Sequence, residues 1–291
     1  MSRVPPPFLE RLIDDAAVFP PGNSPLPAAI AAHRATRSDP FLSAVTGPLV
    51  LAASMLPELE RLADPAHSPA LDVLVIVPTP ADVDAVLSTP AHGWTIVGLD
   101  VRVADPSAAA EAFATIADAV AGRLRSADIA IEFPWPSGDP AAWRAALRAT
   151  AETGMKVKLR TGGTSADAFP PVAALADAIT VLADAGAAFK CTAGLHGAIR
   201  HVDPATGFPH HGFVNILVAT MRALTGGSPA ETAAILGSED GPLLARALGS
   251  ISAAQMAATR AAFTSYGSCS LDEPLEDLER LGLLSPAGVR R

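Results

Sequence analysis

Lysine is rare in this chain, and its three occurrences are the residues best suited to covalent chemistry. Lys156, Lys158 and Lys190 are the only lysines among 21 basic residues, and the others are arginines. A composition rich in alanine, arginine and proline indicates a bias towards arginine wherever either cation serves. Arginine keeps its proton, whereas a desolvated lysine can lose its proton and become a nucleophile. The remaining lysines are therefore candidates for chemistry that arginine cannot perform.

The spacing of these lysines predicts that two of them share one interior site. Lys158 and Arg160 lie on the same face of one apolar run, because side chains alternate along a strand. Lys190 lies in the next apolar run along the chain. Two ammonium groups in a site of low dielectric disfavour double protonation, so one pKa is expected to fall. We expect Lys158 to be the nucleophile and Lys190 the neighbour that lowers its pKa. Lys156, at the start of its run, is expected to be partly solvated below the site.

Carboxylates on other apolar runs are candidate partners of the lysines. Glu132 and Asp100 are predicted to point inwards near the ends of their runs, and Asp14 and Asp15 lie in the first run. At the carboxyl ends of barrel strands, such groups can shuttle protons or act as counter-ions. We expect Glu132 or Asp100 to be the proton shuttle, with simple charge balance as the alternative.

Two glycine-containing turns follow strands and could hold an anionic group through backbone N–H groups and hydroxyls. Turns of this composition are also ordinary connections, so the position beside cationic strands is what favours binding. Arg160 could in addition hold a carboxylate through two parallel hydrogen bonds. The predicted substrate-binding residues of these segments are Arg160, Thr161, Gly162, Gly163, Tyr266, Gly267 and Ser268.

Four of the seven histidines lie in the segment 196–211. His196 and His201, with Arg200, are predicted to bind substrate or transfer protons. Metal ligation by His196, His201, His210 and His211 is the alternative, although no tight ligand spacing such as H-E-x-x-H is present. A purely structural role in a polar lid is the third interpretation. We therefore expect no cofactor, with a divalent metal as the alternative.

The elements that must position these residues alternate between short apolar runs and Ala-rich amphipathic stretches. Strands are predicted at 13–19, 48–53, 71–77, 95–102, 128–133, 155–160, 187–192 and 263–267. Helices are predicted at 25–37, 55–63, 80–88, 107–125, 139–153, 170–185 and 273–282. Eight alternating strands predict an α/β fold, a single (β/α)₈ TIM barrel over residues 1–291. Failure of the first and last strands would instead favour a doubly wound sheet.

The connection after the seventh predicted strand is too long for a simple unit. Residues 195–262 are expected to form an extended insertion, with 195–212 as a lid over the barrel mouth and about three short helices behind it. Long ordered loops of this kind are usually functional.

Composition excludes several classes of protein. The chain has 291 residues, 49% of them hydrophobic, and a net charge of −9, which argues against disorder and against a nucleic-acid binder. No apolar run reaches the roughly 20 residues of a membrane helix, and the first residues lack the apolar core of a signal peptide. A cytoplasmic protein with no membrane partner is predicted. Cys191 and Cys269 are expected to be reduced, buried thiols, and a homo-oligomer is left open.

The stretches Lys158-Leu159-Arg160-Thr161-Gly162-Gly163 and Phe189-Lys190-Cys191-Thr192-Ala193-Gly194 resemble the paired lysine strands of class I aldolases of the deoxyribose-phosphate type. This resemblance covers about residues 155–194. It implies a (β/α)₈ barrel with a Schiff-base lysine on the sixth strand, at Lys158, and a second lysine on the seventh, at Lys190. The chain departs from that family at Leu159 and Arg160, where the family has small hydroxyl residues, and in its histidine segment. Both stretches also resemble an uncharacterised bacterial barrel family, which implies no function.

Together these features predict an enzyme that acts on a small anionic carbonyl compound, phosphorylated or carboxylated. A lysine Schiff-base aldolase or lyase is the leading hypothesis. A metal-dependent lyase or hydrolase that uses the histidines of 196–211 is the first alternative. A non-catalytic binding barrel is the second.

Overall fold

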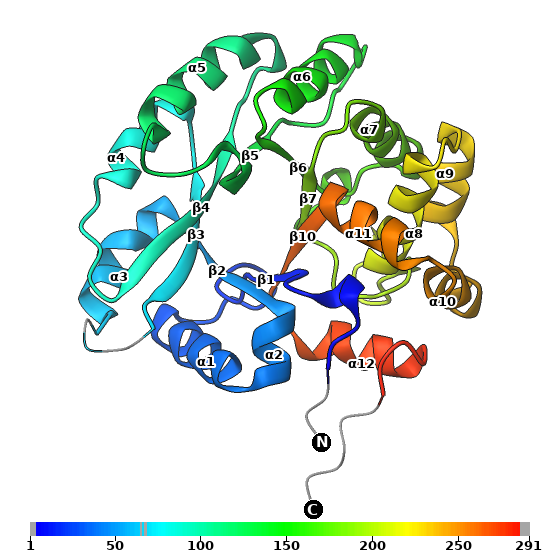
Figure 1. Cartoon of the computed structure of the whole chain (residues 1–291), viewed down its shortest axis with the longest axis horizontal. Coiled ribbons are helices and arrows are strands. Elements are labelled where there is room, and N and C mark those ends of the chain that lie inside the picture. The colour runs from blue at the N-terminus through cyan, green and yellow to red at the C-terminus, as the bar shows by residue number, and fades with distance from the viewer. Residues whose placement is uncertain (1–3, 65, 67–68, 286–291) are drawn as a thin grey trace, which may run out of the picture.

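The chain forms a closed barrel of eight parallel strands surrounded by helices (Figure 1). The computed structural model describes residues 4–64, 66 and 69–285, so the ends of the predicted domain 1–291 lie outside the described residues. The barrel order is β1-β10-β7-β6-β5-β4-β3-β2. The strands are β1 (Ile13–Asp15), β2 (Thr46–Ala52), β3 (Leu71–Val77), β4 (Trp94–Arg102), β5 (Ile129–Glu132), β6 (Lys156–Arg160), β7 (Phe189–Thr192) and β10 (Phe263–Ser268).

Closure of the barrel depends on the two strands with the weakest sequence patterns. β1 pairs with β10 on one side and with β2 on the other, all in parallel. The predicted (β/α)₈ barrel is therefore confirmed, and the doubly wound alternative is wrong. β1 is shorter than the predicted 13–19 because the Ala17 N–H bonds the Asp15 carboxylate at 3.2 Å, which turns the chain away from the sheet.

Helices cover the outside of the barrel. They are α1 (Leu26–Ser38), α2 (Pro40–Val45), α3 (Leu56–Leu62), α4 (Val83–Leu87), α5 (Ala109–Val120), α6 (Ala141–Glu152), α7 (Val172–Asp184), α8 (Phe213–Leu224), α9 (Pro229–Gly237), α10 (Gly241–Gly249), α11 (Ala253–Ala262) and α12 (Asp272–Arg280). The sequence analysis did not predict α2. Asp39 ends α1 and begins α2, because its carboxylate accepts the N–H groups of Phe41 and Leu42 while Pro40 occupies the first turn.

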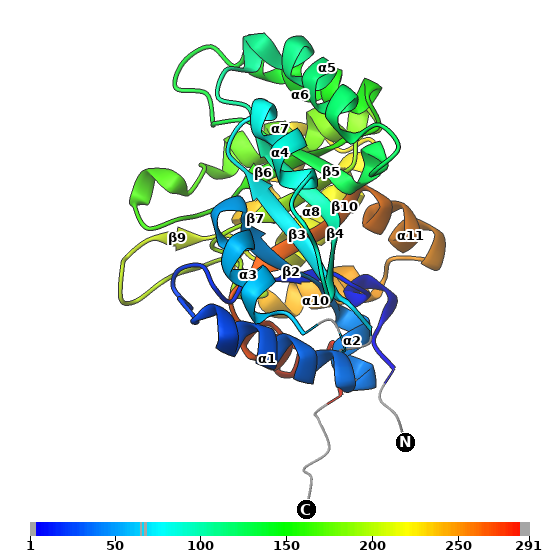
Figure 2. The ribbon, with the colours of Figure 1, turned by 90° about the vertical axis from the view of Figure 1, so that its left-hand side faces the viewer.

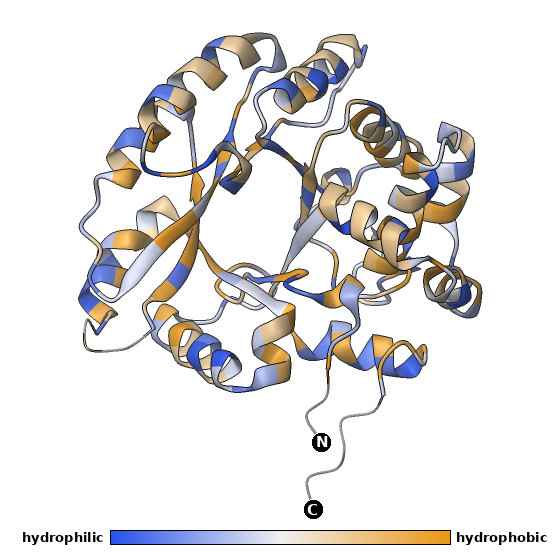
Figure 3. Cartoon of the chain, viewed as in Figure 1, coloured by the Kyte–Doolittle hydropathy of each residue, from blue (hydrophilic) through white to orange (hydrophobic). Residues whose placement is uncertain are grey.

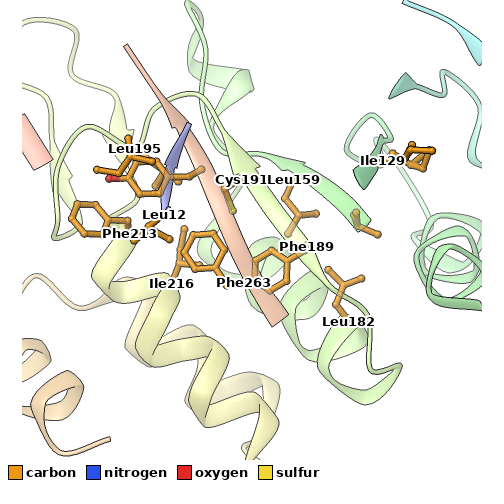
Figure 4. Packing of buried hydrophobic residues seen from close by; sticks show 14 of the residues in the cluster. Leu12, Ile129, Leu159, Leu182, Phe189, Cys191, Leu195, Phe213, Ile216 and Phe263 are labelled. Carbon is orange, nitrogen blue, oxygen red and sulfur yellow. The ribbon is translucent and has the colours of Figure 1, made fainter. Parts of the chain in front are cut away.

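The outward faces of the strands form the hydrophobic core with the helices. Phe189 of β7 stacks on Phe263 of β10, with ring centroids 5.2 Å apart, and both rings are buried. In Figure 4 these rings lie among side chains such as Leu182 of α7 and Ile216 of α8. One stretch of the described residues, Ala166–Asp184, is long and apolar enough to span a membrane. Its apolar character reflects core packing, since six residues of α7 are buried in the barrel layer.

The insertion after β7 contains more structure than predicted. It holds a small antiparallel hairpin, β8 (His201–Val202) with β9 (Pro209–His210), followed by four helices, α8 to α11, instead of about three. Figure 2 shows β9 and α11 on opposite sides of the barrel. The hairpin segment lines the carboxyl end of the barrel. α8 is almost entirely buried and serves as a barrel helix.

The inward faces of the strands are unusually polar for a barrel of this kind, whose interior is usually filled by branched aliphatic side chains. Hydrophilic positions interrupt the hydrophobic ones along the strands in Figure 3. Asp14, Asp100, Lys158 and Lys190 are all buried. Gly47 at the start of β2 gives Asp14 its space, because a Cβ at this position would overlap the Asp14 carboxylate.

Substitution Gly47→Ala should therefore displace Asp14 and lower the free energy of unfolding by about 1–3 kcal/mol. Gly138→Ala is the matched control, because a Cβ there meets no atom within 4 Å, and it should change stability by less than about 0.5 kcal/mol. Urea unfolding of both variants measures the difference. Equal stabilities would show that Asp14 does not need this space.

Candidate active site

A large cavity opens at the carboxyl end of the barrel strands, where barrel enzymes place their chemistry. Its volume is about 1390 Å³. The ends of the strands and the segment after β7 line its walls, while Lys158, Lys190 and Asp100 contribute to its floor. The two lysines occupy paired positions on neighbouring parallel strands.

Lys158 lies between two carboxylates. Its Nζ is 3.0 Å from Oδ2 of Asp100 and 3.0 Å from Oε2 of Glu132, and its side chain is 1% exposed. The other oxygen of Glu132 accepts from Arg160, with Nε at 2.9 Å and Nη2 at 2.8 Å. Arg160 thus holds one oxygen of Glu132 through two nitrogens, while the other oxygen of Glu132 contacts Lys158.

Lys190 lies between two other carboxylates. Its Nζ is 2.8 Å from Oδ2 of Asp14 and 3.4 Å from Oδ1 of Asp100. Ser265 of β10 donates to the same Asp14 oxygen at 2.8 Å. Cations and carboxylates therefore alternate across the interior in what we term the ion-pair row. Its members are Arg160, Glu132, Lys158, Asp100, Lys190 and Asp14.

The ion-pair row favours the charged form of Asp100, Glu132 and Lys190. Burial alone would raise the pKa of Asp100, but Lys158 and Lys190 outweigh burial and hold this pKa below its usual value. The pKa of Glu132 is likewise lowered, since Lys158 and Arg160 outweigh its burial. Burial would lower the pKa of Lys190, but Asp100 and Asp14 raise it above that of a free lysine.

This arrangement corrects the expected interaction between the two lysine amines. Asp100 lies between them, so Lys190 does not act on Lys158 as an isolated like charge. Lys190 itself has a raised pKa and is a stable cation. The lysine whose pKa falls is Lys156, because of burial and the charge of Lys190.

Arginines gather around the cavity above the ion-pair row. Arg160 and Arg102 line it from the strand ends, and Arg200 lines it from the segment after β7. Arg102 Nε lies 3.9 Å from Oε1 of Glu132 and its side chain is about half exposed, at 53%. Gly163 and Gly267 also line the cavity, as do His196 and His201. Together these groups can hold a carboxylate or phosphate over the lysines.

Two residues of the first predicted anion-binding turn lie elsewhere. Thr161 is fully buried, and its hydroxyl donates to the carbonyl oxygens of Thr192 and Ala193 at 3.1 and 2.6 Å. Gly162 packs against Gly194, where a Cβ would approach the Gly194 Cα to 2.8 Å. Both residues join the end of β6 to the end of β7, and neither is among the residues that line the cavity.

Tyr266 and Ser268 are also misplaced by the prediction. Ser265 bonds Asp14 in the interior and Gly267 lines the cavity, so alternation turns the residues between and after them outwards. Tyr266 is fully buried and stacks on Phe213 of α8 at 5.2 Å, and burial raises its pKa. Ser268 is buried and donates to the Ser270 carbonyl.

The four histidines of the predicted lid do not converge on one point. The rings of His201 and His210 stack 5.3 Å apart, whereas His196 pairs with Glu273 of α12 at 3.0 Å. His211 is buried away from the cavity. Within residues 4–64, 66 and 69–285, no three His, Cys, Asp or Glu side chains form a group that could hold a metal ion. The metal-ligand set predicted as an alternative is therefore not assembled here.

A thiol–imidazole contact at the mouth of the cavity was not expected from the sequence. Cys269 Sγ lies 3.8 and 3.9 Å from the two ring nitrogens of His196. Both residues line the cavity, as does Glu273, the partner of His196. Cys269 is only half-buried, contrary to prediction, while Cys191 is buried as predicted. Burial raises the pKa of Cys269, so it is a neutral thiol beside a histidine–carboxylate pair that can exchange protons. The only signal for this contact in the sequence was that Cys269 lies in the second predicted turn, directly after Gly267 and Ser268.

A comparison with protein-family models, with curated proteins and with solved structures finds no match to this chain. The function must therefore be argued from the site itself.

His211 should make the protein acid-sensitive. Its Nε2 donates to the Pro170 carbonyl at 2.8 Å, and its Nδ1 faces an Arg200 nitrogen at 3.4 Å, so the neutral ring is the form that fits. Burial lowers the pKa of His211 to about 4. Because the unfolded chain binds this proton near pH 6.5, folding stability is lost as the pH falls from about 6.5 to about 4.

His211→Gln should remove this pH dependence, since an amide can donate to Pro170 without titrating. The stability of the native protein should fall by about 3 kcal/mol relative to the variant across that pH window. Urea unfolding at several pH values measures the effect. Parallel pH profiles for the two proteins would show that His211 titrates normally.

Asp100→Asn should be strongly destabilising, because both lysines lose their shared counter-ion. Removal of one partner from a buried ion-pair network costs about 3–5 kcal/mol. Asp128→Asn is the control, since its partner Arg125 is 82% exposed and such surface pairs contribute about 1 kcal/mol or less. Equal losses in the two variants would contradict the central role of Asp100.

Proposed function

We propose that this protein is an enzyme that makes or breaks a carbon–carbon bond in a small carbonyl compound through an imine with Lys158. The observation that supports this proposal is the position of Asp100 between two lysine amines on the floor of the mouth cavity, 3.0 Å from Lys158 and 3.4 Å from Lys190. A nucleophilic lysine needs a nearby proton acceptor and a second cation. The site provides both.

Substrate binding supplies the step that frees the Lys158 amine. Arg160 holds Glu132, and Lys158 and Arg160 together keep the pKa of Glu132 low. An anionic group of the substrate competes for Arg160, so Glu132 becomes a stronger base. The Lys158 proton then passes to Glu132, at 3.0 Å, and leaves a neutral amine. In this scheme the substrate anion and the lysine nucleophile are coupled through one carboxylate.

The neutral amine adds to the substrate carbonyl carbon, and the carbonyl oxygen takes up a proton. Glu132 returns the proton that it took from Lys158, so the hydroxyl group of this adduct leaves as water and a protonated imine remains. When the neighbouring carbon–carbon bond breaks, its electron pair moves to the imine nitrogen and gives an enamine. The hydroxyl group of the departing fragment passes its proton to Glu132 and becomes a carbonyl group. Lys190 remains protonated, because Asp100 and Asp14 raise its pKa, and can stabilise negative charge on oxygen. Asp100 contacts both amines and remains the counter-ion of Lys190 once Lys158 has lost its proton.

The mouth of the cavity favours a substrate with a carboxylate or phosphate. Arg102, Arg160 and Arg200 face the same space and carry fixed positive charge. The scheme uses no cofactor. We place the enzyme in the cytoplasm, in keeping with its reduced cysteines.

Reductive trapping tests the proposal directly. Purified protein is incubated with ketoacids, aldehydes and sugar phosphates, then treated with borohydride and analysed by peptide mass spectrometry. We expect a covalent adduct on Lys158 with at least one member of the panel. The adduct should disappear in Lys158→Met, which leaves Asp100 paired with Lys190 and Glu132 paired with Arg160.

The other two lysines provide matched controls. Lys156→Arg should keep the adduct, because this amine lies at the opposite end of the barrel. Lys190→Met should fold and give a weaker adduct. An adduct on Lys190 would reverse the assignment of the nucleophile, and no adduct with any compound would overturn the imine mechanism. If metal is detected in the purified protein and no adduct forms, the metal-dependent alternative is favoured. If there is no bound metal and no adduct, a non-catalytic binding barrel is favoured.

A further inference from the structure

A second cavity lies at the amino end of the barrel strands, opposite the candidate active site. Its volume is about 380 Å³, and its lining comes from the starts of β2, β6 and β10 and the chain that precedes β1 and β5. Barrel interiors are normally filled at this level. Here Gly47, Gly98 and Ala130 occupy wall positions and leave the space open.

Each carboxylate that lines this cavity is already paired with a lysine or an arginine. Asp14 accepts from Lys190 and Ser265, each at 2.8 Å. Asp128 is held by Arg125, with contacts of 2.8 and 2.9 Å. Asp100, the third carboxylate on the wall, belongs to the ion-pair row.

Three cations of the same cavity have no carboxylate partner within 4 Å in the part of the chain that the structure describes. They are Arg11, Lys156 and Arg260. Burial, together with the charge of Lys190, lowers the pKa of Lys156, and burial lowers the pKa of Arg260 to about 10. Nearby carboxylates, Asp14 among them, oppose both shifts, but burial outweighs them, so the positive charge is compensated only in part. A bound anion would supply that compensation.

Backbone carbonyl groups hold one of these cations, Arg260, in place. The Arg260 guanidinium donates to the carbonyl oxygens of Glu10 at 2.9 Å and Thr264 at 2.8 Å, and also to that of Phe263. Arg11 has a φ of +47°, a left-handed conformation that is unfavourable for a residue with a side chain. Strained residues of this kind persist where the surrounding structure requires them and are concentrated at functional sites.

We propose that the cavity at the amino end of the barrel is a binding site for a phosphate-class oxyanion, held by Lys156, Arg11 and Arg260. A tetrahedral dianion offers several acceptor oxygens in different directions, which suits cations that arrive from three separate elements. The cavity has room for such a group and its ordered water. The ligand is either free phosphate or the phosphate of a small monoester. This site is independent of the proposed imine chemistry.

Isothermal titration of the full-length protein with inorganic phosphate, and separately with glycerol phosphate, tests the proposal at constant ionic strength. We expect saturable binding of at least one compound. Binding of phosphate alone would identify free phosphate as the ligand, and tighter binding of glycerol phosphate would identify a monoester. Absence of binding by both compounds would overturn the proposal.

Variants locate the bound anion. Lys156→Gln and Arg11→Gln should each weaken binding about tenfold or more, since each removes one charge-assisted contact. Lys156→Gln should also leave the Tm of the anion-free protein unchanged or higher, because an unpaired, partly buried cation is removed. Loss of stability in this variant would show that Lys156 has a structural partner and would count against the site.

Two further variants serve as controls. Arg148→Gln removes an exposed arginine that lines neither cavity, and it should bind phosphate as the native protein does. Arg102→Gln alters the opposite mouth, where a second anion could bind, and should retain the phosphate binding that Lys156→Gln weakens. Loss of phosphate binding in Arg102→Gln, with binding intact in Lys156→Gln, would place the anion in the candidate active site and overturn the proposal.

Discussion

The structure depends on a single carboxylate placed between two buried ammonium groups. The register of β6 and β7 puts Lys158 and Lys190 side by side, and without a counter-ion their charges would repel strongly in a medium of low dielectric. Asp100 from β4 contacts both amines, while Glu132 and Asp14 contact one each. The barrel can therefore carry cations on adjacent strands only because carboxylates from other strands reach the same level.

The ion-pair row also divides the interior of the barrel into two cavities. Asp100 and Lys190 line both the large cavity at the carboxyl end and the smaller one at the amino end. Layers of aliphatic side chains would separate the two cavities by uncharged groups, whereas the ion-pair row places charged groups in contact with both cavities. Both cavities are lined by cations as well as carboxylates.

Much of the fold and part of the site could be predicted from local patterns. The strand Leu71–Val77 has the predicted bounds, and the inward direction of Lys158 and Lys190 follows from alternation along their strands. Errors arose where another interaction overrides the local pattern. The Asp15 carboxylate ends β1 early by accepting the Ala17 N–H. Tyr266 was predicted to bind substrate, but alternation along β10 turns its side chain outwards, where it stacks on Phe213.

The sequence by itself determined the barrel, the rarity of lysine and the faces on which the lysines lie, because hydrophobic periodicity and alternation act along a single strand. Only the tertiary structure decided which charges meet. Lys190 pairs with Asp14 because β1 closes the barrel against β10. At the opposite end, no carboxylate of the described residues forms an ion pair with Lys156. Those pairings depend on strand register, barrel closure and the space left by small residues, which are relations between segments far apart in the chain.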